Sequence, residues 1–152
     1  MRTSCRFAMA VHVLTVLGYK DGDRVTSGLL AESVNTNPVI IRRLLSTLQR
    51  AGLVETRKGV GLGSRLARSA ARINLAQIYR AVEAEDAFVL PRKKPNLHCP
   101  VGGCIRETLG RVFTSAEDAL VKDLEHTTLA GIVDTVRACC SSGAGKEKRK
   151  KI

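Results

Sequence analysis

The most regular pattern of apolar and polar positions lies in the segment that opens with Pro38. Its large apolar residues recur at i, i+3, i+4 and i+7, so they form one stripe along a helix: Ile41, Leu44, Leu45 and Leu48. Asn37 is a suitable N-cap, Pro38 fits the first helical position, and Gly52 is the expected left-handed terminator. The pattern predicts a helix that buries this stripe and turns a polar face outward.

Shorter elements flank this helix. Residues 26–34 predict a first short helix, and the polar residues 35–37 predict the turn between the two helices. After Gly52, residues 53–56 predict a short strand, and the Gly-rich residues 57–63 predict a flexible loop. The order of helix, turn, helix, strand and loop predicts a mainly α fold with a small β wing, namely a winged helix-turn-helix.

Helical spacing and proline positions organise the chain on either side. Residues 4–17 predict an N-terminal helix, and the capping box of Asn74 and Gln77 predicts a short helix that reaches Ala84. Proline is too frequent in residues 90–103 for a helix or a ladder, so we expect an irregular loop there, with Pro91, Pro95 and Pro100.

A long helix is expected after this loop. Its apolar residues fall at helical spacing and predict a helix from Ile105 to about Glu125, roughly 30 Å long. These residues are Ile105, Leu109, Val112, Ala116, Ala119 and Leu120. A further turn or two is expected from near Thr127 or Thr128. The apolar seam has no obvious second layer in its own chain, so it packs either on the N-terminal helix or on a second copy of the chain.

The distribution of charge along the chain indicates what kind of partner it binds. The 152 residues carry a formal net charge of +11. From Pro38 to Arg72 eight basic residues face the single acid Glu55, so this segment holds +7 of that charge. One basic helix face is usually just a solvated surface, but one sign concentrated on a helix and its following loop is typical of a polyanion partner. Aromatic residues make up only 3% of the chain, which favours duplex DNA over a single strand that would stack on aromatic rings.

These patterns predict a DNA-binding surface on the second helix and the segments beside it. The candidate residues are Thr26, Ser27, Asn37, Pro38, Val39, Arg42, Arg43, Ser46, Arg50, Lys58 and Gly59. The outer helix face is expected to meet the groove and the backbone, because guanidinium forks and hydroxyls suit phosphates and guanine edges. It carries Arg42, Arg43, Ser46 and Arg50. Asn37, Pro38 and Val39, at the helix entry, are expected near base edges or phosphates. Lys58 and Gly59, in the loop, are expected to lie along the neighbouring groove. A twofold dimer would present two such helices to successive major grooves, about 34 to 36 Å apart, so we expect a homodimer rather than a monomer.

The same sequence argues against export and against a membrane span. No apolar stretch reaches the roughly 18 residues that a spanning helix needs. Residues 7–17 superficially resemble a secretory signal, but His12 interrupts them and no small-residue cleavage site follows. Five cysteines, an odd number, without a targeting signal favour a reducing compartment, so we expect a cytoplasmic protein. The basic end, residues 139–152, predicts a disordered tail that either adds nonspecific phosphate contacts or only solubilises the chain.

In order and spacing, ten segments match one family: residues 7–14, 30–33, 38–44 with Leu48, 51–54, 58–59, 66–67, 73–75, 79–83, 116–117 and 128–130. Through them the chain resembles the Rrf2 family of winged-helix regulators, which includes bacterial regulators of iron-sulfur cluster assembly, nitric oxide response and cysteine metabolism. The resemblance implies a homodimer with a crossing long helix that binds palindromic operator DNA as a repressor or dual regulator. The wing departs from the family at Leu62 and Ser64. We therefore divide the chain into a DNA-binding domain (1–85), a cysteine-containing sensor loop (86–104), dimerisation helices (105–138) and the tail.

The cysteines depart from the family most clearly. Members that hold a [2Fe-2S] cluster usually place three cysteines in the loop before the long helix, whereas this loop offers Cys99 and Cys104 with His98 beside them. The two thiols are either inert and partly buried, a redox or electrophile switch, part of a cluster completed by His98 or another chain's cysteine, or a zinc site. A helix N-terminus near Gly102 would lower the pKa of a thiol at Cys99 and favour the switch. We expect no cofactor, with [2Fe-2S] as the alternative, a core or edge position for Cys5, and no role for the pair Cys139 and Cys140.

Two other classes of protein remain as rivals. A winged-helix protein-interaction module would use the same fold to bind an acidic protein surface. A thiol enzyme would use Cys99 as nucleophile with His98 or His126, but adjacent residues seldom have the required geometry, and no carboxylate partner or oxyanion signature accompanies them. We therefore expect the chain not to be an enzyme.

Overall fold

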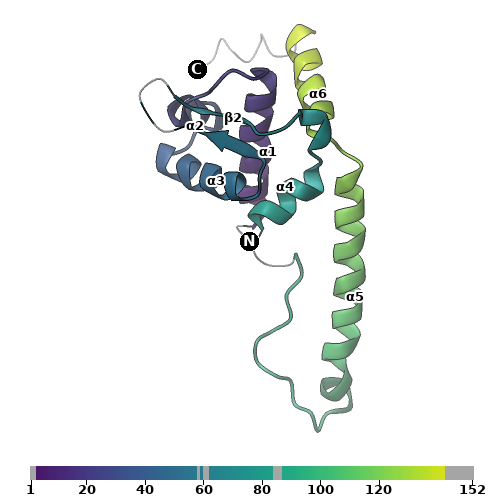
Figure 1. The fold of residues 1–152 in the computed structure, drawn as a ribbon. Helices are drawn as coiled ribbons and strands as arrows, with labels where there is room; N and C mark the ends of the chain where they lie inside the picture. Colours follow the sequence, from purple (N-terminus) through teal and green to yellow (C-terminus); the bar gives the residue numbers. More distant parts are fainter. Residues whose placement is uncertain (1–2, 58, 60–61, 84–86, 143–152) are drawn as a thin grey trace.

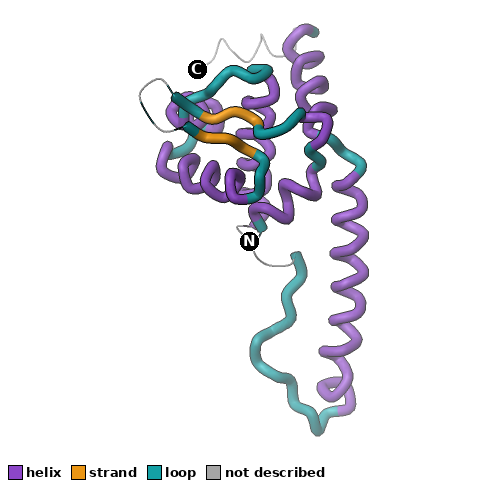
Figure 2. The backbone as a smooth tube through the Cα atoms, in the orientation of Figure 1, coloured by secondary structure: helices purple, strands orange, loops and turns teal. Residues whose placement is uncertain are grey.

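The structure is a computed structural model that describes residues 3–57, 59, 62–83 and 87–142. Its elements, in chain order, are α1 (Thr3–Tyr19), α2 (Ser27–Val34), α3 (Pro38–Arg50), β1 (Val54–Thr56), β2 (Ser64–Leu66), the 3₁₀ turn η1 (Ala70–Arg72), α4 (Leu75–Val82), α5 (Pro100–Glu125) and α6 (Leu129–Ser141). The elements up to α4 form a head, and α5 extends well beyond it (Figures 1 and 2). The expected class, mainly α with a small β wing, is confirmed.

The core of the head is built around the predicted stripe of α3. Its four apolar residues are at most 4% exposed, and they pack with the buried side of α1, which includes Leu14 and Leu17. The predicted ends of α3 are also confirmed. The Asn37 side chain accepts a hydrogen bond from the Val39 N–H at 2.8 Å, and Gly52 has a φ of +70° just after the helix. Because the stripe is buried, the other face of α3 is left to solvent.

The wing is a two-stranded antiparallel hairpin in which Val54 pairs with Leu66 and Thr56 with Ser64. The sequence predicts β1 but not β2. Strand β2 is held from both sides, because Ser64 also bridges to Val25 in the segment before α2. The backbone at Val25 lies so close to Gly63 that a Cβ on Gly63 would be 2.5 Å from the Val25 carbonyl oxygen. Gly63 is therefore required by close packing rather than by loop flexibility.

The start of α5 corrects one expectation. The helix begins at Pro100, five residues before Ile105, so Pro100 occupies the first helical position instead of belonging to the loop. Gly102 then lies in the first turn, where a Cβ would meet the Asn96 carbonyl oxygen at 2.0 Å. Gly102 and Gly103, which were expected to introduce the helix, thus already lie within it, and Gly102 lets the preceding chain fold back on it. The predicted end at Glu125 is confirmed. A helix follows as expected, but α6 has 13 residues, more than the predicted turn or two, and it runs to Ser141, so residues 139–141 are helical and not part of a tail.

Helix α5 is joined to the head near its C-terminal half. The Glu117 carboxylate accepts hydrogen bonds from the Tyr79 hydroxyl of α4 at 2.9 Å and from the Ala87 N–H at 3.1 Å. The ring of Tyr79 in turn packs at right angles to the ring of Phe7 on α1, with the ring centroids 5.5 Å apart. Arg80 and Glu125 add an ion pair at 3.2 Å. A short series of contacts therefore links α5, α4 and the N-terminal end of α1.

Candidate nucleic-acid interface

The exposed face of α3 carries the predicted basic residues. Arg42, Arg43, Ser46 and Arg50 are all exposed, on the side of the helix opposite the buried stripe. Val39, at the start of the helix, is 46% exposed and adds an apolar side chain to this face. Among known helix-turn-helix proteins, the N-terminal residues of the second helix contact base edges, and apolar side chains contact the thymine methyl group. The face thus combines groups that bind phosphates with groups that can read bases.

A groove of about 870 Å³ separates α3 from the wing. Arg42, Ser46 and Arg50 line it on one side, and Arg57, Gly59 and Leu62 on the other. Ser27, at the first turn of α2, lies at one end, where its hydroxyl accepts a hydrogen bond from the Arg42 Nε at 3.3 Å. Of the predicted residues, the groove brings together Ser27, Arg42, Ser46, Arg50 and Gly59. Thr26, Asn37, Pro38, Val39 and Arg43 do not line it, and Lys58 lies outside the described residues.

The N-terminal ends of α2 and α3 are capped in the same way. The Thr26 hydroxyl accepts from the Leu29 N–H at 3.3 Å, as Asn37 does for Val39 in α3. Thr26 is thus the N-cap of α2, and the helix begins one residue later than predicted, at Ser27. Both caps are exposed.

The only acid of the basic segment is neutralised within the wing. Glu55 receives Arg24 at 2.7 Å on one oxygen and both the Nε and Nη2 atoms of Arg65 on the other, at 3.1 and 2.9 Å. Arg57 lies 3.6 Å from the same carboxylate. The hydrogen bonds from Arg24, and then those from Arg65, lower the pKa of Glu55. The carboxylate consequently fixes the hairpin and leaves the surrounding surface positively charged.

Sequence reasoning missed Arg24 and Arg65 as part of this surface. Arg24 lies 31 residues from Glu55, and its guanidinium also donates to the Gly63 carbonyl oxygen at 3.0 Å. Arg65 is the cross-strand partner of Glu55 in the hairpin. The second contact could have been found from the sequence only with β2 in place, since opposite charges directly across a strand pair attract.

Cys99 is the N-cap residue of α5 and is exposed. The backbone N–H groups of Gly102 and Val101, in the first turn of the helix, lower the pKa of its thiol. The chain reaches this position through a turn in which the Asn96 side chain accepts from the His98 N–H at 3.0 Å and its carbonyl from the Cys99 N–H at 3.3 Å. The helix N-terminus expected next to Cys99 is therefore present, although it begins at Pro100 and not at the glycines.

The other four cysteines are exposed as well. Cys104, like Cys99, is exposed, which does not fit the alternative of inert and partly buried thiols. Cys5 is also exposed and does not belong to the core, because it lies on the outer side of α1. Cys139 and Cys140 are exposed near the end of α6.

A [2Fe-2S] cluster does not fit the donors that the described residues bring together. They contain no group of three or more His, Cys, Asp or Glu side chains placed to hold a metal ion. Cys99, Cys104 and His98 thus remain weak candidates, because the described residues do not bring them together as one set of ligands. In the same part of the chain, no helix is both long and apolar enough to cross a membrane.

The fold and its basic face define a class of protein, the winged helix-turn-helix regulators that bind DNA. The chain belongs to the Rrf2 family, described as iron-dependent transcriptional regulators, which matches residues 3–135. This confirms the family expected from the sequence, and its members are transcriptional regulators rather than enzymes.

Individual relatives are similar over most of their length. A protein named as the HTH-type transcriptional regulator YwnA of Bacillus subtilis is 34% identical over 129 residues, which cover 85% of this chain and 95% of YwnA. A crystal structure described as that of a DNA-binding protein is also 34% identical, with a TM-score of 0.67 over 84% of this chain and 97% of its own. A transcriptional regulator from Lactobacillus plantarum is 26% identical and has a TM-score of 0.71, over 95% and 96% of the two chains.

Proposed function

We propose that this chain is a homodimeric repressor that binds palindromic operator DNA with α3 in the major groove and the wing beside it. The observation that carries the proposal is the exposed face of α3, where three arginines and a serine lie opposite the buried stripe, and Arg42, Ser46 and Arg50 among them line the groove beside the wing. Guanidinium groups bind phosphates and guanine edges, and α3 is presented in the way a recognition helix requires. Occupancy of an operator within a promoter would exclude the transcription machinery.

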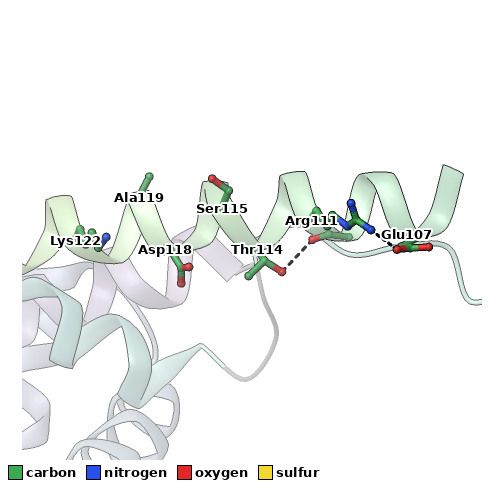
Figure 3. A pocket seen from close by; sticks show the side chains of 8 residues that line it. Glu107, Arg111, Thr114, Ser115, Asp118, Ala119 and Lys122 are labelled. Atoms are coloured by element: carbon green, nitrogen blue, oxygen red, sulfur yellow. Dashed lines mark hydrogen bonds and ion pairs between the residues drawn. The ribbon is translucent and has the colours of Figure 1, made fainter. Parts of the chain in front are cut away.

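The surface of α5 supports the dimer. Val112 is 55% exposed although it lies on the predicted apolar seam. A neighbouring face, seen in Figure 3, carries small residues in its middle, including Thr114 and Ser115, with Glu107 and Arg111 towards one end and Asp118 and Lys122 towards the other. Two copies crossing over the small residues could approach closely, and their charged ends would then meet residues of opposite sign. The long helix would thereby gain the second layer that its own chain lacks.

DNA selection tests this proposal. Duplexes recovered from a random library by the wild-type protein are expected to contain a palindrome whose half-sites are one helical turn apart. The Arg42→Gln and Arg43→Gln variants are expected to bind that duplex at least about tenfold more weakly, because each removes a charge-assisted contact. Arg92→Gln, an exposed arginine in the loop before α5, is the matched control. Equal affinity for the palindrome and for random duplexes, or for the variants and the control, would instead favour a protein-interaction module.

Sedimentation tests the dimer separately. The wild-type protein is expected to sediment as a dimer, and Val112→Glu, which places a charge on the exposed seam, is expected to shift it towards the monomer. A monomeric wild-type protein that still selects a palindrome would overturn the proposed α5 interface.

We also propose that Cys99 makes the regulator responsive to oxidants. Its thiol is exposed, and the amides at the start of α5 favour the thiolate. The thiolate can attack one oxygen of hydrogen peroxide, which forms a sulfenic acid and releases hydroxide. Such a change at the helix N-terminus would alter the loop that leads into the dimer helix. Peroxide is expected to change the operator affinity of the wild-type protein but not of Cys99→Ser, and an equal response in both would refute this part.

A further inference from the structure

One hydroxyl of the recognition helix is shared by two guanidinium groups from different helices. The Thr47 Oγ1 atom accepts a hydrogen bond from the Arg6 Nη2 atom of α1 at 3.3 Å and one from the Arg50 Nη2 atom of α3 at 3.4 Å. The same hydroxyl donates its proton to the Arg43 carbonyl oxygen at 3.2 Å, as helical threonines often do. Its orientation is therefore fixed, and its lone pairs face the two arginines.

This arrangement holds two positive charges together without cancelling them. Arginine stays protonated in proteins, and a hydroxyl is a neutral acceptor. Among the described residues, no carboxylate lies within salt-bridge distance of Arg6 or Arg50. Glu83 attracts Arg6 only over a longer distance than a salt bridge, and its Oε1 atom is buried without a hydrogen-bond partner among the described residues. Both guanidinium groups are exposed, so each keeps donors free for an incoming oxyanion.

The cluster continues the basic face of α3 onto another helix. Arg50 is the last residue of α3, so Arg6 lies at the end of the recognition helix that is remote from its base-reading first turn. At that end a helix lying in the major groove leaves the bases and meets the sugar-phosphate backbone. A guanidinium pair is well suited to a phosphate there, because each fork can donate two parallel hydrogen bonds.

We propose that Arg6 and Arg50 together bind a phosphate of the DNA backbone, so that the DNA interface extends from α3 to the N-terminal end of α1. This rests on the proposed DNA-binding function and adds Arg6 to it. Thr47 is a positioning residue, which holds the two guanidinium groups side by side before DNA arrives. The contact reads no base, so it contributes affinity and register but not sequence preference.

The salt dependence of DNA binding tests the proposal. Each phosphate contact contributes about 0.9 to the slope of log K against log salt, and a dimer carries two copies of Arg6, so Arg6→Gln is expected to make the slope shallower by about 2. The variant is also expected to weaken binding to the selected palindrome and to a random duplex by the same factor. Arg6→Lys retains the charge but not the fork, so it is expected to keep the wild-type slope and recover part of the affinity. Arg92→Gln is the control for the loss of one surface arginine.

The outcomes distinguish the proposed DNA-binding function from the proposed role of Arg6. A wild-type protein that binds no duplex removes the proposed function and this inference together. A wild-type protein that binds with a steep salt dependence, while Arg6→Gln matches Arg92→Gln in affinity and slope, removes only the inference. Arg6→Lys behaving like Arg6→Gln in both quantities would do the same. Inorganic phosphate at matched ionic strength is expected to leave the melting temperatures of wild type and Arg6→Gln equally unchanged, and selective stabilisation of the wild type would reassign the cluster to a free phosphate ion.

Discussion

Replacing Gly102 with alanine should uncouple the turn before α5 from the helix. The added methyl carbon would lie 2.0 Å from the Asn96 carbonyl oxygen and 3.0 Å from its carbonyl carbon, and both are backbone atoms that no rotamer change can move. Gly103→Ala is the matched control, because its methyl group would lie 3.5 Å from the Leu97 carbonyl oxygen, an ordinary contact distance. Two adjacent glycines in one helical turn should therefore respond in opposite directions.

The magnitudes follow from two opposing terms. Forcing a methyl group into a filled site costs about 1 to 3 kcal/mol. Alanine in place of glycine within a helix returns about 0.5 to 1 kcal/mol. In a chain of this size 1 kcal/mol moves the melting temperature by roughly 2 to 4 °C. Gly103→Ala should thus raise the melting temperature by roughly 1 to 4 °C, and Gly102→Ala should lower it by up to roughly 10 °C, as measured by circular dichroism.

The same pair of variants tests the origin of the thiol's acidity. In the wild-type protein, the pH profile of Cys99 alkylation by iodoacetamide should have its midpoint below the ordinary thiol value of 9.0, because the Gly102 and Val101 amides favour the thiolate. Gly102→Ala displaces the turn that carries Cys99, so its midpoint should move back towards 9.0. Gly103→Ala should keep the wild-type profile. If Gly102→Ala melts and reacts like Gly103→Ala, the close approach of Asn96 to the helix is not what shapes this segment.

Three further predictions concern charge. Arg42, Arg43, Arg50 and Arg57 are exposed on α3 and the wing, and in the proposed dimer they would make eight phosphate contacts. Operator affinity should then fall about 10⁴-fold between about 50 and 200 mM salt, and a slope shallower than about −3 in a filter-binding titration would contradict this. Glu55 has a pKa below its ordinary value of 4.5. The stability that it adds relative to Glu55→Gln should therefore be complete above pH 4.5 and be lost as the pH falls through the lowered pKa. Urea unfolding of both proteins as a function of pH measures this. Burial raises the pKa of Glu83. The free energy of unfolding of the wild-type protein, relative to that of Glu83→Gln, should therefore fall as the pH rises from 4.5. If this difference in free energy rises or stays flat instead, the burial of Glu83 is contradicted.

The parts of the fold that the sequence predicts are those fixed by local spacing. The stripe of α3, its Asn37 cap and its Gly52 terminator all lie within sixteen residues, and each acts through near neighbours in the chain. The Asn74 capping box is likewise formed as expected, with Asn74 and Gln77 bonding to each other's backbone N–H groups. Local patterns of this kind need no tertiary information.

The parts that sequence reasoning missed depend on long-range contacts. Strand β2 has three residues and no alternation of its own, and it becomes a strand because Val25 and β1 hold it from two sides. Gly102 resembles a loop residue by composition, and only its contact with Asn96 shows why a helix contains it. In the candidate interface, the arginines of α3 were predictable from periodicity, whereas Arg6 and Arg24 join through contacts that span 41 and 31 residues.

The carboxylate of Glu117 ties α5 to two different segments at once, one oxygen on the hydroxyl of Tyr79 and the other on the amide of Ala87. Helix α5 therefore cannot slide or rotate at this point without breaking one of these bonds or carrying a segment along. Any displacement of α5 would be passed to α4 through the carboxylate of Glu117. Tyr79 contacts Phe7, and Phe7 follows Arg6 in the chain. A displacement of α5 would therefore also reach the N-terminal end of α1.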